Sequence, residues 1–326
     1  MTTYIHPAEI TVRRPYDVEG DWILFSTCNY RCGYCFWDED ALGAKIEPIA
    51  PVERLAGFFD RTELTWLLHL TGGEPFIYPD FVRLCSLLTR RHLISVNTNA
   101  DSPHIRAFID EVNPGRVDFI NCGVHERERQ VRRGTRRFVT NVLAMRSAGF
   151  DVFVSCVMYP DLFETFPELW RRYASEGVVV IPKALRGTHL GRRYPGGYTE
   201  TERALFREYT ARAAEFYAGQ FGRRDEPPTV NPFMDEHLFL ERLPDYRGDL
   251  CEAGHLFVRI VPSGEIRRCG PDDVIGNVAE HWFSRRDRAS ICDVLECPYF
   301  CEKYRLPPGD AGRRHAIASR MRRGPA

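Results

Sequence analysis

The chain has 326 residues, of which 44% are hydrophobic and 27% charged, and a formal net charge of −1. A nearly neutral chain has no net field that attracts nucleic acid or an anionic membrane, so we expect neither as a partner. No run of about 18 apolar residues and no signal-peptide pattern occurs, which predicts a cytoplasmic protein. In a reducing compartment its 11 cysteines are not expected to form disulfides.

Six short apolar runs alternate with helical patterns through the first two thirds of the chain. The runs span 21–26, 65–71, 92–98, 116–124, 150–159 and 177–185, and helices are predicted at 51–61, 79–91, 135–149 and 166–177. This alternation is typical of βα units with parallel strands. The sequence therefore predicts an α/β fold, a partial (β/α)6 TIM-like barrel, with its chemistry in the loops at the carboxyl ends of the strands.

The pattern changes after about residue 190. A helix is predicted at 199–222, followed by a polar stretch with prolines at 223–232. Beyond it the sequence is irregular and rich in cysteine, apart from a predicted β-hairpin at 255–270. We expect an N-terminal extension (1–20), a barrel (21–225) and a small C-terminal domain (226–326).

Three cysteines follow the first predicted strand with the spacing C-x3-C-x2-C: Cys28, Cys32 and Cys35. Clustered thiolates ligate zinc or iron–sulfur clusters. A structural zinc takes four ligands, commonly from paired C-x2-C knuckles, and this loop supplies three. Three thiolates on a four-iron cluster leave one iron open for a cofactor or substrate. We favour that interpretation over three coincidental thiols.

With Tyr34 included, the motif reads C-x3-C-x-aromatic-C and resembles that of the radical S-adenosylmethionine (SAM) superfamily. The resemblance implies a [4Fe–4S] cluster on the three cysteines, with SAM bound to the open iron. It also implies an electron donor such as flavodoxin or ferredoxin. Reductive cleavage of SAM to a 5′-deoxyadenosyl radical would then abstract hydrogen from the substrate, and Tyr34 would pack on the adenine.

Further residues resemble the family's SAM contacts and occur in the expected order. The resemblance implies that Gly72, Gly73 and Glu74 hold the methionine amino group, that Asn97 and Asn99 contact the ribose, and that Ser155 reaches the ribose or carboxylate. Strand alternation puts Ser155 and Cys156 on opposite faces, and we expect Ser155 to face the barrel interior. Ordinary hydrogen bonding at strand ends is the alternative role.

Two other polar pairs follow predicted strands. His125 and Glu126, after the fourth strand, are candidates for substrate binding or proton transfer. Lys183 and Arg186, in the IPKALRG stretch, are candidates for binding an anionic group such as the SAM carboxylate or a phosphate. The alternative for both pairs is an ordinary surface position.

A second group of cysteines lies near the C-terminus: Cys251, Cys269, Cys292, Cys297 and Cys301. The segment C-x12-G-x4-C from Cys251 to Cys269 resembles the opening of SPASM and shorter twitch domains, which hold auxiliary iron–sulfur clusters. Five cysteines cannot complete two cubanes, so we expect one auxiliary [4Fe–4S] cluster on Cys251, Cys269, Cys297 and Cys301. Cys292 is the possible substitute ligand, and a structural zinc is the alternative.

The expected substrate is a small polar molecule. About 20 residues precede the first predicted strand, which leaves no room for the leader-recognition domain of many peptide-modifying relatives. Twitch-bearing relatives include an aminocyclitol dehydrogenase of antibiotic biosynthesis. We therefore expect oxidation or epimerisation of a sugar, aminocyclitol or nucleoside.

Two alternatives stay open. One is an epimerase or crosslinker of a ribosomal peptide, in which Cys122, Cys156 or Cys292 would serve as hydrogen donor. The other is a non-catalytic iron–sulfur or zinc protein.

Overall fold

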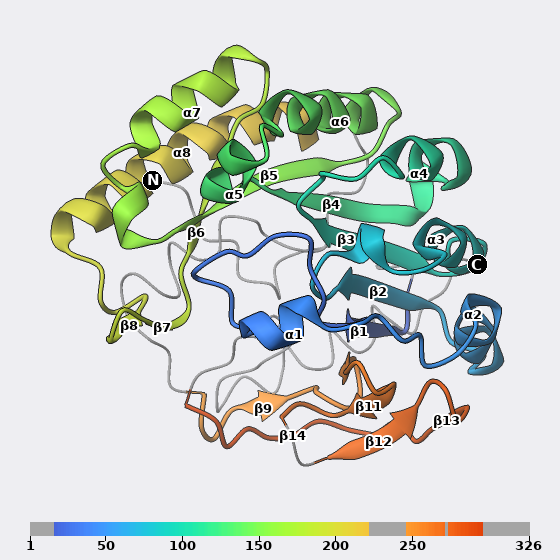
Figure 1. Cartoon of the computed structure of the whole chain (residues 1–326). Helices are drawn as coiled ribbons and strands as arrows, with labels where there is room; N and C mark the ends of the chain where they lie inside the picture. Colours follow the sequence, from blue (N-terminus) through green and yellow to red (C-terminus); the bar gives the residue numbers. More distant parts are fainter. Residues whose placement is uncertain (1–15, 222–245, 271–272, 296–326) are drawn as a thin grey trace.

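Six parallel strands form the centre of the structure, a computed structural model that describes residues 16–221, 246–270 and 273–295 (Figure 1). Neighbouring strands in the sheet are also neighbours in the sequence. They are β1 (Val18–Ile23), β2 (Trp66–Thr71), β3 (Leu93–Thr98), β4 (Val117–Gly123), β5 (Val152–Met158) and β6 (Ile181–Ala184). The six predicted strands and the α/β fold class are confirmed. β1 begins three residues earlier than predicted.

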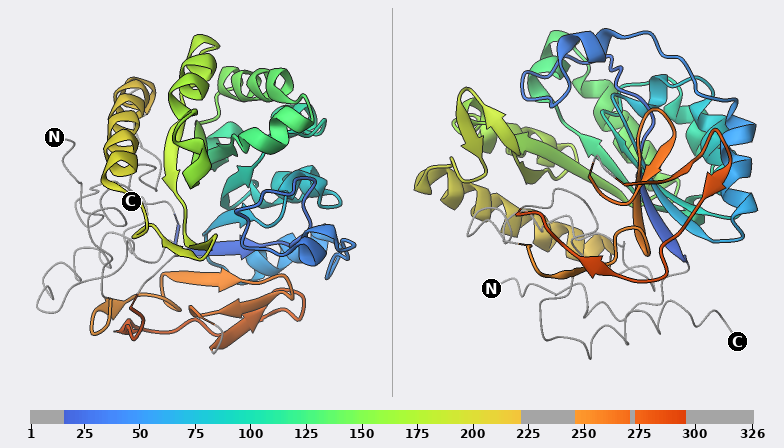
Figure 2. Two further views of the ribbon diagram at one scale, coloured as in Figure 1. Left: turned by 60° about the vertical axis from the view of Figure 1, so that its left-hand side comes forward. Right: turned by 90° about the horizontal axis from the view of Figure 1, so that it is seen from below.

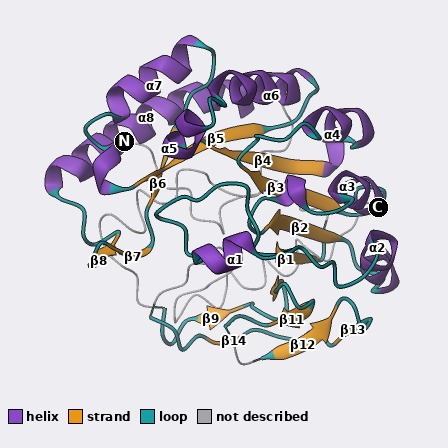
Figure 3. Ribbon diagram, in the orientation of Figure 1, coloured by secondary structure: helices purple, strands orange, loops and turns teal. Residues whose placement is uncertain are grey.

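Helices cover the outer face of this sheet (Figure 3). The five predicted helices correspond to α2 (Val52–Arg61), α3 (Phe81–Leu88), α6 (Thr135–Ser147), α7 (Phe166–Ser175) and α8 (Glu200–Phe221). Three further helices, α1 (Glu39–Gly43), α4 (Ile105–Glu111) and α5 (Glu126–Val131), were not predicted. They are too short to show a helical repeat in the sequence.

The pattern of apolar residues explains this packing. Helix α2 buries Leu55, Phe58 and Phe59, which recur at helical spacing on one face. The ring of Phe59 packs against Trp22 of β1, with centroids 5.2 Å apart. Since side chains alternate along a strand, Asp21 faces the interior of the barrel.

The C-terminal strands extend the same sheet past β1. Strand β10 (Phe257–Ile260) pairs in parallel with β1, and β11 (Glu265–Arg267), β12 (Val274–Asn277) and β13 (Trp282–Phe283) follow as antiparallel neighbours. Figure 2 shows them along the edge of the sheet. The predicted hairpin is confirmed as β10–β11. The predicted boundary near residue 225 lies outside the described residues, and the sheet runs through both predicted domains.

Two small ribbons complete the described structure. Strands β7 (Gly187–His189) and β8 (Arg192–Tyr194) form one hairpin after β6, and β9 (Leu250–Cys251) pairs with β14 (Ser290–Ile291). In the part of the chain described, no helix has the length and apolar character needed to cross a bilayer.

Candidate active site at the carboxyl ends of the strands

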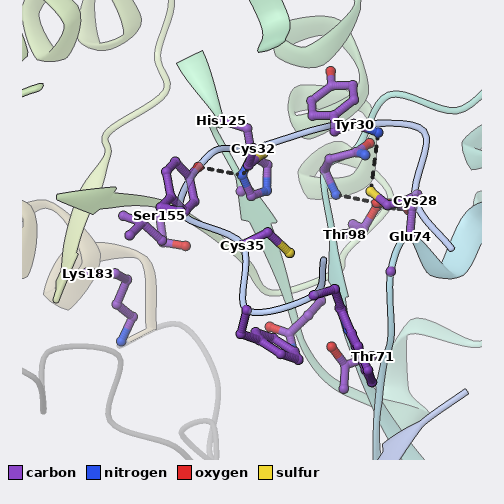
Figure 4. A pocket seen from close by; sticks show the side chains of 18 of the residues that line it. Cys28, Tyr30, Cys32, Cys35, Thr71, Glu74, Thr98, His125, Ser155 and Lys183 are labelled. Carbon is purple, nitrogen blue, oxygen red and sulfur yellow. Dashed lines mark hydrogen bonds between the residues drawn. The ribbon is translucent and has the colours of Figure 1, made fainter. Parts of the chain in front are cut away.

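A cavity of about 410 Å³ lies at the carboxyl ends of the barrel strands (Figure 4). Thirteen of the predicted site residues line it: Cys28, Cys32, Tyr34, Cys35, Gly72, Gly73, Glu74, Asn97, Asn99, His125, Ser155, Lys183 and Arg186. They come from loops or strand ends that are far apart in the sequence. The fold therefore gathers them at the place where parallel α/β sheets carry their ligand sites.

Helix α1 holds the cysteine loop in place. The backbone N–H of Cys28 donates to the carbonyl of Leu42 (3.0 Å), and the hydroxyls of Ser26 and Thr27 donate to the carbonyls of Ala41 (2.9 Å) and Ala44 (2.7 Å). These contacts fix the loop at its start, just before the first thiol.

Burial keeps the thiols of this loop protonated in the protein alone. Desolvation raises the pKa of Cys28 to about 11 and that of Cys32 to about 12, and it also raises the pKa of Cys35. A metal deprotonates the thiols that it binds, so such a site loads with release of protons. Protonated thiols of this kind are potential metal ligands and weak nucleophiles.

The glycines of the Gly72–Gly73–Glu74 segment allow two backbones to meet. The N–H groups of Gly73 and Glu74 donate to the carbonyls of Phe25 (2.8 Å) and Thr27 (3.0 Å) in the cysteine loop. A Cβ on Gly73 would lie 1.8 Å from the Thr27 carbonyl oxygen, so no other residue fits without a backbone shift. This pairing fixes Glu74 beside Cys28.

Glu74 is 1% exposed and accepts three hydrogen bonds. The donors are the hydroxyl of Thr98 (2.6 Å) and the backbone N–H groups of Asn99 (2.7 Å) and Phe76 (3.1 Å). Desolvation outweighs these bonds and raises the pKa of the carboxyl to about 7. A cationic group bound in the cavity would restore the charged form.

Three polar side chains at the ends of β3, β4 and β5 are linked by hydrogen bonds. The Ser155 hydroxyl donates to Asn121 Oδ1 (2.8 Å), and Asn121 Nδ2 donates to Asn97 Oδ1 (3.0 Å). Ser155 lines the cavity and Cys156 belongs to the hydrophobic core, as alternation predicted. Asn121 was missed, although the same alternation places it opposite Cys122.

His125 lies directly against the cysteine loop (Figure 4). Its Nδ1 is 2.8 Å from the Tyr34 hydroxyl and 3.5 Å from Cys32 Sγ. Burial lowers the pKa of His125 to about 4, so the imidazole is neutral at pH 7. The ring of Tyr34 stacks on Tyr159, with centroids 5.1 Å apart.

Glu126 does not reach the cavity. Its carboxylate accepts a hydrogen bond from the Tyr173 hydroxyl (3.0 Å) and pairs with Arg172, both on α7. As the first residue of α5, Glu126 points toward α7, whereas His125 before it faces the thiols. The expectation that Glu126 takes part in substrate binding or proton transfer is therefore wrong, because its carboxylate is directed away from the cavity.

The three candidate hydrogen donors are also placed elsewhere. Cys122 and Cys156 lie on the outward faces of β4 and β5, buried in the hydrophobic core, because their neighbours Gly123 and Ser155 face the cavity. Cys292 is buried in a separate cluster near the C-terminal strands. None of the three lines the cavity.

That separate cluster brings together the C-terminal thiols that the structure describes. Cys251 and Cys292 are buried and Cys269 packs against them, beside Tyr246 and Phe257. The remaining expected ligands, Cys297 and Cys301, lie outside the described residues.

Sequence reasoning also missed Arg129, which is completely buried. Its guanidinium donates to the carbonyls of Val124 (2.7 Å) and Asn99 (2.6 Å) and lies 3.9 Å from the centroid of the Phe138 ring. It thereby ties together the loops that follow β3 and β4. Because it stands in the charged run HERERQVRR, nothing in the sequence distinguishes it from exposed arginines.

The donor set fits an iron–sulfur cluster with an organic cofactor beside it. Within the described ranges, no group of three or more His, Cys, Asp or Glu side chains could hold a single metal ion, whereas in a four-iron cluster each thiolate binds a different iron. The buried Nε1 of Trp37, on the cavity wall, finds no acceptor among the described residues. Figure 4 shows Lys183 across the cavity from Cys28 and Glu74.

Comparison with known proteins agrees with this geometry. Residues 22–171 match the model of the radical SAM superfamily. The chain is 24% identical over 277 residues to the PqqA peptide cyclase of Gluconobacter oxydans, covering 78% of this chain and 71% of the relative.

Two solved structures are similar in fold. One is anSMEcpe with bound AdoMet and the Kp18Cys peptide, with a TM-score of 0.54 and 12% identity over 93% of this chain and 97% of that one. The other is Streptococcus suis SuiB bound to precursor peptide SuiA, with a TM-score of 0.52 and 13% identity over 81% of this chain. The chain spans 63% of that SuiB chain.

Proposed function

We propose that this chain, whose residues 22–171 match the model of the radical SAM superfamily, is an enzyme that cleaves SAM reductively in order to modify a peptide. The observation that supports this most strongly is the convergence of Cys28, Cys32 and Cys35 on one cavity with Glu74. The motif predicts such a site, and the proposal is supported by the position of these side chains in one cavity at the carboxyl ends of the strands.

An iron–sulfur cluster and SAM would occupy different parts of the cavity. Cys28, Cys32 and Cys35 would hold a [4Fe–4S] cluster. When bound, this cluster and SAM supply one-electron reductive chemistry that generates a hydrogen-abstracting radical. The other residues of the cavity would position the reactants.

The polar residues of the cavity suit the polar ends of SAM. Glu74, buried and close to Cys28, would accept the methionine ammonium, and Lys183 and Arg186 would bind an anionic group. The amides of Asn97 and Asn121 and the Ser155 hydroxyl offer donors and acceptors to a ribose. Phe36, which is 79% exposed, Trp37 and Leu42 add apolar surface to the lining of the cavity.

The relatives favour a peptide over the small sugar-like substrate expected from the sequence. One is named a peptide cyclase, and two similar structures hold peptides. Their identities are 24% or lower, so they support the substrate class by analogy. We therefore place the peptide first and the sugar, aminocyclitol or nucleoside second.

The test is anaerobic reconstitution with iron and sulfide, followed by reduction in the presence of SAM. We expect 5′-deoxyadenosine from the wild-type protein, and in the C28A, C32A and C35A variants we expect loss of this product and of about four irons per chain. C85A is the matched control, since Cys85 is buried in the core away from the cavity. If SAM is not cleaved, the non-catalytic iron–sulfur or zinc alternative holds.

Substrate class is tested by deuterium transfer. Deuterated candidate peptides and deuterated aminocyclitols are each incubated with the reconstituted protein, and 5′-deoxyadenosine is analysed by mass spectrometry. Deuterium from a peptide supports the proposal, while deuterium from an aminocyclitol overturns the substrate class and leaves the radical chemistry standing.

As a second proposal, the chain holds an auxiliary iron–sulfur cluster. The close packing of the Cys251, Cys269 and Cys292 side chains supports it. The expected ligands are Cys251 and Cys269 with Cys297 and Cys301, and Cys292 is the substitute. We expect about eight irons per chain, as two cubanes require, falling to about four in the C251A variant. Zinc in place of the second four irons would support the zinc alternative.

A further inference from the structure

Three groups meet at one point on the wall of the cavity. His125 Nδ1 lies 2.8 Å from the Tyr34 hydroxyl and 3.5 Å from Cys32 Sγ. The Tyr34 side chain also interacts with the Cys32 thiol and lowers its pKa, against the larger effect of burial. The sulfur of one expected cluster ligand is therefore within reach of two donors.

The backbone around His125 is adapted to this contact. His125 adopts φ +46°, in the left-handed region that residues other than glycine rarely occupy. Its ring lies over Gly123, where a Cβ would be 2.2 Å from His125 Nε2. Any side chain at position 123 would displace the imidazole. The left-handed backbone at His125 and the space left by Gly123 together set the position of the ring.

The protons can be arranged in two ways. With Nδ1 unprotonated, the imidazole accepts the Tyr34 proton and gives nothing to sulfur. With a proton on Nδ1, the imidazole donates to the Tyr34 oxygen (2.8 Å) or to Cys32 Sγ (3.5 Å), and the Tyr34 proton can then be donated to that sulfur once it is a thiolate. A cluster-bound cysteine has lost its proton and can only accept, so binding of the cluster favours the second arrangement.

We propose that His125 is a positioning residue which, with Tyr34, donates a hydrogen bond to the Cys32 sulfur when that sulfur ligates the cluster. Donors to a cluster sulfur stabilise the more negative, reduced state and so favour acceptance of an electron. This inference rests on the proposed cluster and assigns to His125 a role in tuning it, in place of the substrate or proton-transfer role expected from the sequence.

Two isosteric substitutions separate this role from a packing role. In the H125N variant the amide nitrogen takes the place of Nδ1, and asparagine tolerates a positive φ. In the H125Q variant the amide nitrogen takes the place of Nε2, next to Gly123 and away from the sulfur. Y34F removes the second donor and leaves His125 unchanged.

The measurement is the ratio of reduced to oxidised cluster at a fixed ambient potential, by electron paramagnetic resonance. The signal that changes on addition of SAM identifies this cluster. Iron content is determined for every variant.

We expect H125Q and Y34F each to lower that ratio about tenfold, the scale of one charge-assisted hydrogen bond, and H125N to stay near wild type. The proposal is overturned if H125Q and Y34F bind full iron and give the wild-type ratio, or if H125N falls as far as H125Q. If H125Q loses iron, Y34F alone decides. A wild-type protein that binds no iron would instead refute the proposed function.

Discussion

At the scale of single residues, alanine substitutions at two glycines of the site are expected to differ in their effect on the unfolding midpoint. A Cβ on Gly73 would lie 1.8 Å from the Thr27 carbonyl oxygen, whereas a Cβ on Gly33 would meet no atom within 4 Å. We expect G73A to lower the unfolding midpoint by about 5 °C, because the backbone must shift, and G33A by about 1 °C or less. Thermal unfolding followed by circular dichroism measures both. Equal midpoints would show that the two backbones do not meet as described.

The raised pKa of Glu74 predicts that the affinity for SAM depends on pH. Burial raises its pKa to about 7, so the carboxyl is neutral below pH 7 and charged above it. Because only the charged form attracts an ammonium strongly, we expect SAM to bind about tenfold more tightly at pH 8 than at pH 6. The same raised pKa means that the protein without SAM loses stability as the pH rises from 4.5 to 7.

The E74Q variant is the control for this pH dependence, since its side chain carries no charge at either pH. Dissociation constants from equilibrium dialysis with the reconstituted protein should be the same at pH 6 and pH 8. If E74Q keeps the wild-type pH dependence, Glu74 is not the group responsible.

At the scale of elements, a polar row crosses the barrel interior beneath the cavity. Strand register places Arg259, Asp21, His69 and Ser95 side by side on β10, β1, β2 and β3. His69 is completely buried and lies between Glu19 Oε1 (2.8 Å) and Ser95 Oγ (2.5 Å). Barrel interiors are usually apolar, so this network depends on mutual hydrogen bonding.

Substitution of Glu19 alone should therefore lower the free energy of unfolding more than substitution of both Glu19 and His69. We expect E19L to lower the free energy of unfolding by about 3–5 kcal/mol, since it removes the acceptor of a buried imidazole, and E19L/H69L to recover part of the loss. Urea denaturation of the protein without cofactors measures this. A double variant less stable than E19L would mean that packing, and not the missing acceptor, causes the loss.

The predictability of elements follows their length and regularity. The six strands and five longer helices could be predicted because apolar residues recur along them. Alternation correctly put Ser155 and Cys156 on opposite faces, and the expectation that Ser155 is the inward one is confirmed. The position of Glu126 could not be predicted. The backbone of His125 is in the left-handed conformation, which turns the chain just before Glu126. No sequence pattern reveals such a turn.

At the scale of the whole molecule, the cysteine motif correctly indicated which residues gather in the cavity, whereas the expected substrate rested on the short N-terminal segment and on the twitch resemblance. The motif works because thiols spaced within one loop must lie close together in any fold. The division into a barrel and a C-terminal domain was predicted because the alternation of apolar runs and helical patterns stops after about residue 190. Such a change in the sequence pattern carries no information on strand pairing. The long-range pairing of β1 with β10 joins the two regions in one sheet.

A shared sheet predicts that the barrel and the C-terminal strands unfold together. Ile260 of β10 is completely buried in the core cluster that contains Trp22 and Trp66 of the barrel. We expect I260A to cost about 2–5 kcal/mol and to speed amide hydrogen exchange in β2 as well as in β10. The control I291A, at a side chain 59% exposed on β14, should leave both unchanged. Hydrogen exchange followed by mass spectrometry decides, because faster exchange confined to residues 246–295 would mean that the C-terminal strands are an independent unit.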